Sequence, residues 1–111
     1  MHLTATLAKI QNEMAEQLPS EVLQAFGENL NELIEQKIDQ KALTIGDQAP
    51  DISVLDTDGK EIKLYDLLQN GPVIINFFRG NWCPFCMAEL SDYHESIQQF
   101  HLPTTQFLFI S

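Results

Sequence analysis

Apolar residues at helical spacing predict two helices in the N-terminal part of the chain, over residues 3 to about 18 and 21 to about 40. The two stripes comprise Leu3, Leu7, Ile10, Met14 and Leu18, and then Val22, Leu23, Phe26, Leu30, Leu33, Ile34 and Ile38. Pro19 separates the helices, and Ser20 is expected to cap the second one. Because periodic apolar stripes are normally packed, we interpret residues 1–42 as a helical extension that packs on the domain or on a partner chain.

The pattern changes to short strands after a connector that begins near residue 43. Residues 52–55 and 61–64 flank a turn that contains Asp58-Gly59, which predicts a β-hairpin. Residues 65–69 predict one helical turn, which the following Asn-Gly-Pro sequence ends.

A nearly unbroken apolar run at residues 73–78 predicts a strand that is buried on both faces. Residues 79–81 carry turn chemistry, and the Cys-Pro-Phe-Cys motif at 83–86 then opens a helix. The apolar face of that helix is predicted to comprise Met87, Leu90, His94, Ile97 and Phe100. Residues 106–110 form another apolar strand, so the segment predicts a βαβ unit with a parallel strand pair.

This second parallel strand ends with the chain, at Ser111. A parallel pair with no further covering element exposes an edge or a face. We therefore expect either a chain truncated after the second parallel strand or a partner that completes the sheet. The expected assembly is a homo-oligomer, namely a dimer.

The charge balance narrows the possible partners. Sixteen acidic residues against six basic ones give a net charge of −10. Nucleic acids and anionic membrane surfaces both call for a basic patch, so we expect neither as a partner. No apolar run approaches the roughly 20 residues of a membrane span, and the N-terminus has no basic segment followed by an apolar core. We therefore expect a cytoplasmic protein.

The two cysteines of the chain carry the candidate chemistry. Free N–H groups and a partial positive charge at a helix N-terminus stabilise an anion, so Cys83 is expected to ionise more readily than a free cysteine. We interpret Cys83 as the outward nucleophile and Cys86, one turn further on, as the resolving thiol. Pro84 fits the first helical position, where its missing N–H costs nothing.

Half of a zinc site is the alternative interpretation of the two thiols. His94 and His101 are the nearby histidines, but six residues separate them where zinc fingers have three to five. Glu89 is interpreted as a solvated helix charge. We therefore expect no metal and no other cofactor.

Four segments carry a family signature, namely Gly46-Asp-Gln-Ala-Pro-Asp51, the Asp58-Gly59 turn, Asp66-Leu-Leu, and Gly71 to Leu90 with its Arg-Gly-Asn-Trp-Cys-Pro-Phe-Cys core. Together they resemble the alkyl hydroperoxide reductase/thiol-specific antioxidant (AhpC/TSA) family of peroxiredoxin-like proteins. More narrowly, they resemble its bacterial peroxiredoxin-like branch. The resemblance implies an α/β, thioredoxin-like fold in residues 43–111, with the βαβ core and β-hairpin, after the helical extension.

The resemblance also implies a thiol-dependent antioxidant oxidoreductase. Cys83 would attack a hydroperoxide or a disulfide, and Cys86 would then close a redox-active disulfide. A thioredoxin-type reductant would restore both thiols. Trp82 would shield one side of the pair, and Arg79 would hold a thiolate or a peroxide oxygen.

Two positions keep other functions open. Gly80 stands where typical peroxiredoxins carry Thr or Ser, which leaves thiol–disulfide exchange on protein substrates as an alternative. Asn76 stands where thioredoxins carry a buried acid, and an amide cannot take a proton from a buried thiol. A non-catalytic dimerisation or regulatory module is the third hypothesis, motivated by the apolar stripes and the early end of the chain.

Overall fold

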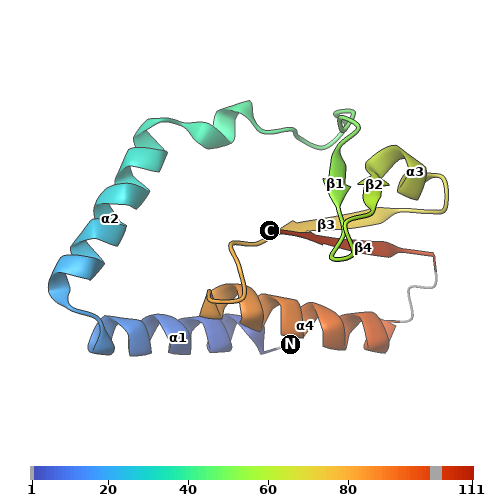
Figure 1. The fold of residues 1–111 in the computed structure, drawn as a ribbon. Coiled ribbons are helices and arrows are strands. Elements are labelled where there is room, and N and C mark those ends of the chain that lie inside the picture. The colour runs from blue at the N-terminus through green and yellow to red at the C-terminus, as the bar shows by residue number, and fades with distance from the viewer. Residues whose placement is uncertain (1, 101–103) are drawn as a thin grey trace. The chain divides into compact units, whose positions relative to one another are not determined.

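The structure is a computed structural model that describes residues 2–100 and 104–111. Its elements are α1 (Leu3–Gln17), α2 (Ser20–Glu35), the 3₁₀-helix η1 (Ile38–Lys41), β1 (Ser53–Leu55), β2 (Glu61–Lys63), α3 (Leu64–Leu68), β3 (Val73–Phe77), α4 (Pro84–Phe100) and β4 (Gln106–Ile110) (Figure 1). The predicted α/β class is confirmed. The chain forms two compact units, residues 8–49 and residues 50–111 with the first seven. The boundary predicted after residue 42 stays a prediction.

The second helix differs from its prediction at both ends. Ser20 is the first helical residue rather than the cap, because Pro19 occupies the N-cap position and its carbonyl accepts the first helical hydrogen bonds. The helix ends at Glu35, since Lys37 adopts a left-handed conformation with φ of 51°. The residues that follow form η1 instead of further α-helix.

Most of the apolar stripe of α2 is exposed, although Val22 and Leu23 are partly buried. Phe26 is 50% exposed and Ile34 is 64% exposed, so the expected burial is not found over most of this stripe. Burial against a partner chain stays a prediction. No helix in the described part of the chain combines the length and the apolar character that crossing a membrane requires.

The predicted β-hairpin is confirmed, with β1 and β2 antiparallel and Val54 opposite Ile62. The turn between them needs Gly59, whose φ is +80°. It is closed by the Asp56 carboxylate, which accepts hydrogen bonds from two backbone N–H groups of the turn at 2.9 Å each. Leu64, only 3% exposed, then leads into α3, the predicted helical turn.

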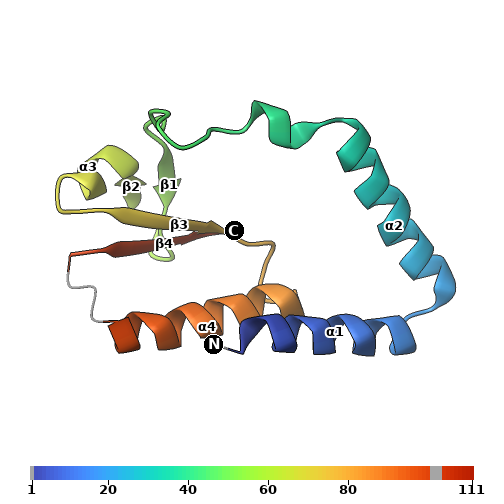
Figure 2. The same ribbon diagram turned by 180° about the vertical axis from the view of Figure 1, so that it is seen from behind.

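The predicted parallel pair is also confirmed, since β3 and β4 run side by side with Asn76 opposite Phe109 (Figure 1). The view from behind shows α4 running along one side of this pair (Figure 2). Tyr93 of α4 contacts the Phe109 ring at 6.1 Å between centroids. Burial of β3 on both faces is wrong, because Phe77 is 73% exposed. In the described chain, α4 covers the face that bears Asn76, and Phe77 points to the other face.

Hydrogen bonds join the segment before β3 to β4. The backbone N–H of Gln106 donates to the Pro72 carbonyl at 2.9 Å, and its side-chain amide donates to the Leu67 carbonyl at 2.6 Å. Gly71 has a φ of +143°, and a Cβ there would overlap the backbone oxygen of Thr104. Glycine at this position therefore allows the close approach that aligns the two strands.

Candidate redox site

The predicted strand–turn–helix arrangement around the cysteines is present. Phe78 continues the sheet by donating its N–H to the Ile110 carbonyl at 2.9 Å. The chain then turns, and the N–H of Cys83 donates to the Gly80 carbonyl at 3.1 Å. Helix α4 begins at Pro84, as predicted. The carbonyl of Cys83 accepts a hydrogen bond from the N–H of Met87, so Cys83 caps the helix.

The two cysteines are free thiols with different exposure. Cys83 is only 3% exposed, whereas Cys86 is partly buried. The expectation that Cys83 faces outward is therefore wrong. Cys83 ends the loop that its N–H closes by bonding to the Gly80 carbonyl, and it also caps α4. This loop and the first turn of the helix therefore lie on either side of Cys83.

Three kinds of interaction stabilise the thiolate of Cys86 and hold its pKa below the ordinary value. The largest is a hydrogen bond with the Cys83 side chain, followed by the backbone N–H of Arg79, whose nitrogen lies 3.4 Å from Sγ. The backbone of Gly80 and the charge of Arg79 act in the same direction, and partial burial opposes them. The arrangement therefore favours an anionic sulfur at Cys86, which the sequence reasoning did not anticipate.

Arg79 and Trp82 form a pair beside the thiols. The Arg79 guanidinium carbon lies 4.7 Å from the centroid of the Trp82 ring, in a cation–π contact. The indole is 65% exposed. That Trp82 shields one side of the cysteine pair stays a prediction.

A hydrogen bond joins β3 to α4 just beyond the cysteines. The Asn76 amide donates to a Glu89 carboxylate oxygen at 3.1 Å, and both side chains are partly buried. The amide oxygen Oδ1 of Asn76 is buried and has no protein partner among the described residues. Glu89 is thus held against the sheet three residues after Cys86, and its interpretation as a solvated charge is wrong. The spacing from Cys86 is visible in the sequence, but the strand partner is not.

In the parts of the chain that the structure describes, no three His, Cys, Asp or Glu residues come close enough to hold a metal ion. His94 is exposed, unlike the partly buried Leu90 and Ile97 of the same predicted stripe, and its ring pairs with Gln98 at 3.1 Å. His101 lies outside the described residues.

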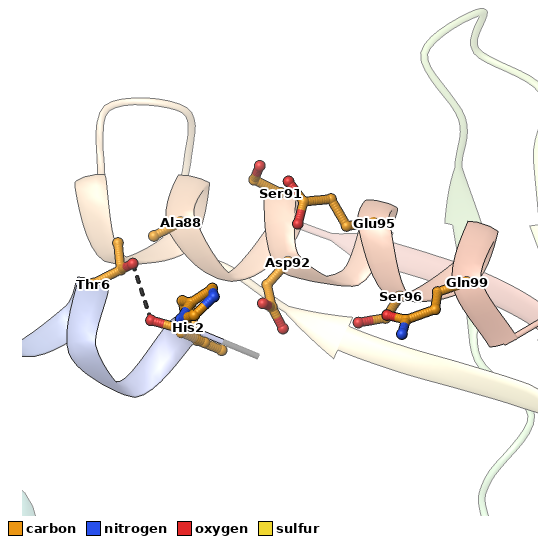
Figure 3. Close-up of a pocket in the computed structure, with 9 residues that line it drawn as sticks. His2, Thr6, Ala88, Ser91, Asp92, Glu95, Ser96 and Gln99 are labelled. Atoms are coloured by element: carbon orange, nitrogen blue, oxygen red, sulfur yellow. Dashed lines mark hydrogen bonds between the residues drawn. The ribbon is translucent and has the colours of Figure 1, made fainter.

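A cavity of about 330 Å³ lies between the start of α1 and α4 (Figure 3). Its α4 side includes Ala88, Asp92 and Glu95, which share one helix face. Cys86 falls on the opposite face of α4 by the same spacing. This cavity is therefore separate from the thiols.

Comparison with known proteins points to one family. The model of the AhpC/TSA family matches residues 45–111. The chain is similar to the thiol-disulfide oxidoreductase ResA of Bacillus thuringiensis (strain Al Hakam), with 40% identity over 57 residues, which are 51% of this chain and 32% of the relative. It is also similar to the 1-Cys peroxiredoxin PER1 of Hordeum vulgare, with 35% identity over 69 residues, 62% of this chain and 31% of the relative.

No solved structure matches the chain significantly. The chain spans about a third of the length of these curated relatives. One relative is named for thiol–disulfide exchange and the other as a peroxiredoxin, so the similarity covers both of the activities considered above.

Proposed function

Because the chain belongs to the AhpC/TSA family, we propose that it is a thiol-dependent oxidoreductase in which Cys83 and Cys86 alternate between two thiols and a disulfide. One observation carries the proposal: free thiols lie at the cap and in the first turn of α4, and a hydrogen bond with the Cys83 side chain is the largest cause that lowers the pKa of Cys86. Two cysteines at this spacing across the first turn of a helix are able to form a disulfide without large movement of the backbone. A helix start beside an arginine is also an environment that activates a thiol.

The leading substrate class is a hydroperoxide. Cys83 gives its proton to the Cys86 sulfur and attacks the terminal peroxide oxygen as a thiolate; the O–O bond breaks, and the leaving oxygen takes this proton from Cys86 and departs as alcohol or water. Cys83 is now a sulfenic acid. Cys86 attacks its sulfur, so that an S–S bond forms and the S–O bond breaks, and the sulfenic oxygen leaves as water. A dithiol donor of the thioredoxin type then returns two electrons and two protons to the pair.

The burial of Cys83 supports this choice. At 3% exposure, the sulfur admits a small electrophile more easily than the disulfide of a folded protein. The partial exposure of Cys86 favours the second candidate, exchange with protein disulfides, in which Cys86 would attack first. The two candidates therefore differ in the sulfur that reacts first.

The proposal extends to the partners, the location, the cofactors and the assembly of the protein. With a net charge of −10, the protein would act without nucleic acid or a membrane, in the cytoplasm. It would require no cofactor, and a second copy of the chain would cover exposed apolar residues such as Ile34. Size-exclusion chromatography with light scattering tests the dimer.

Trapping of the sulfenic acid tests the reaction. Cys86→Ser and Cys83→Ser are each treated with hydrogen peroxide and dimedone, and mass spectrometry locates the adduct. We expect an adduct on Cys83 in Cys86→Ser and none in Cys83→Ser. An adduct only on Cys86 would transfer the attacking role to that thiol. Adducts in neither variant, together with a mixed disulfide to a protein substrate, would favour exchange over peroxide reduction.

A further inference from the structure

We propose that Trp82 is a positioning residue, whose ring holds the Arg79 guanidinium beside Cys86, and that Gly80 provides the space for this arrangement. The inference rests on the proposed function, because it assigns these residues to the step in which Cys86 closes the disulfide. It differs from a shielding role for Trp82, since here the ring acts on Cys86 through Arg79.

The contacts of Arg79 define the arrangement. Its backbone N–H points at Cys86 Sγ, with 3.4 Å between nitrogen and sulfur, while its guanidinium lies over the Trp82 ring at 4.7 Å. A long, exposed arginine side chain has many rotamers in water. The ring restricts this freedom and holds the positive charge at the turn whose backbone N–H contacts Cys86.

Gly80 lies underneath the indole. A Cβ built at this position would overlap Trp82 Nε1 and would come within 2.9 Å of Cδ1. Real Cβ atoms essentially never come this close to another heavy atom, so any other residue would displace the ring. The glycine therefore has a local role, which is to let the indole fold against the turn.

Three charged or titratable groups lie near Cys86 along the chain, namely Cys83, Arg79 and Glu89. The Cys83 thiol and Arg79 both favour the thiolate of Cys86. Glu89, three residues further along α4, accepts a hydrogen bond from the Asn76 amide on the strand. A thiolate at Cys86 is the form that attacks the Cys83 sulfenic sulfur, releasing hydroxide, which takes up a proton to become water.

The experiment measures the pH dependence of alkylation of Cys86 by iodoacetamide, an uncharged reagent, in a Cys83→Ser background where Cys86 is the single thiol. Trp82→Leu, Arg79→Gln and the double variant are compared with this background. We expect both single changes to move the inflection to higher pH and to slow alkylation at pH 7. The double variant should match Arg79→Gln alone, because the ring acts through the arginine.

Two further variants separate positioning from general damage. Trp82→Phe keeps a ring and should remain closer to the background than Trp82→Leu. Phe26→Leu, which removes an exposed aromatic ring from α2, should leave the inflection unchanged. An unchanged inflection in Trp82→Leu would overturn the inference. A shift of the same size when Trp82→Leu is added to Arg79→Gln would overturn it as well.

Alkylation requires no peroxide, so the outcome does not depend on turnover. If the shifts appear and peroxide forms no sulfenic acid, the proposed reaction fails while the positioning role stands. If sulfenic acid forms and Trp82→Leu leaves alkylation unchanged, the positioning role fails alone.

Discussion

The substitution Asn76→Asp tests how the strand and the cysteine helix are joined. It replaces the amide that donates to Glu89 with a second carboxylate. Two unit charges 3.1 Å apart, the distance of the present hydrogen bond, repel by about 1.3 kcal/mol at the dielectric constant of water and by about 5 kcal/mol at an effective value of 20. Because both side chains are only partly buried, we expect a loss of about 1–3 kcal/mol in the free energy of unfolding at pH 7.

The pH dependence of this loss has a defined sign. Each carboxylate raises the pKa of the other, so the folded variant takes up a proton at a pH above the ordinary value of about 4. The penalty is therefore largest when both groups are ionised and shrinks as the pH falls towards about 4. Urea unfolding of variant and parent, followed by circular dichroism at pH 7 and at about pH 4.5, measures the difference.

The matched control is Asn76→Asp combined with Glu89→Gln. This pair restores one donor and one acceptor with their positions exchanged, so most of the lost stability should return. A loss of equal size with and without Glu89→Gln would refute the hydrogen bond as the tie between β3 and α4. Full stability of the single variant would refute it as well.

Three other outcomes follow from particular contacts. Gly71→Ala should destabilise the protein by about 1–3 kcal/mol in urea unfolding, because its backbone is left-handed and a carbonyl oxygen blocks the new Cβ. Gly27→Ala, in the open middle of α2, should instead stabilise by about 0.5–1 kcal/mol; destabilisation there would contradict the helix. In the folded parent, tandem mass spectrometry should show that the alkylation rate of Cys86 rises with an inflection at a pH below about 8.5, the ordinary pKa of a cysteine. The reason is that the Cys83 hydrogen bond and Arg79 lower the pKa of Cys86. The inflection should rise to that value in urea, and the same inflection in both states would contradict the account.

Local patterns in the sequence were sufficient to predict most of the elements. The helical period predicts α1, and the turn at Asp58-Gly59 predicts the hairpin. An apolar strand followed by turn residues and Pro84 places the cysteines at the start of α4. These signals are local, because each depends on residues within one or two turns of one another.

The remaining features depend on contacts between elements. Asn76 and Glu89 are 13 residues apart and meet only because α4 packs along β3. The burial of Cys83 depends on how the preceding turn closes, and the exposure of Phe77 depends on which face of the strand is covered. Spacing along the chain cannot determine any of these three results.

The most direct test of the central claim is peroxide-dependent oxidation of NADPH, coupled through thioredoxin and its reductase, by the parent and by Cys83→Ser. The account predicts saturable turnover in the parent and its loss in the variant, with both thiols intact in the parent at the end of the reaction. Equal turnover in the two proteins, or none in a parent whose thiols are reduced at the start, would contradict it.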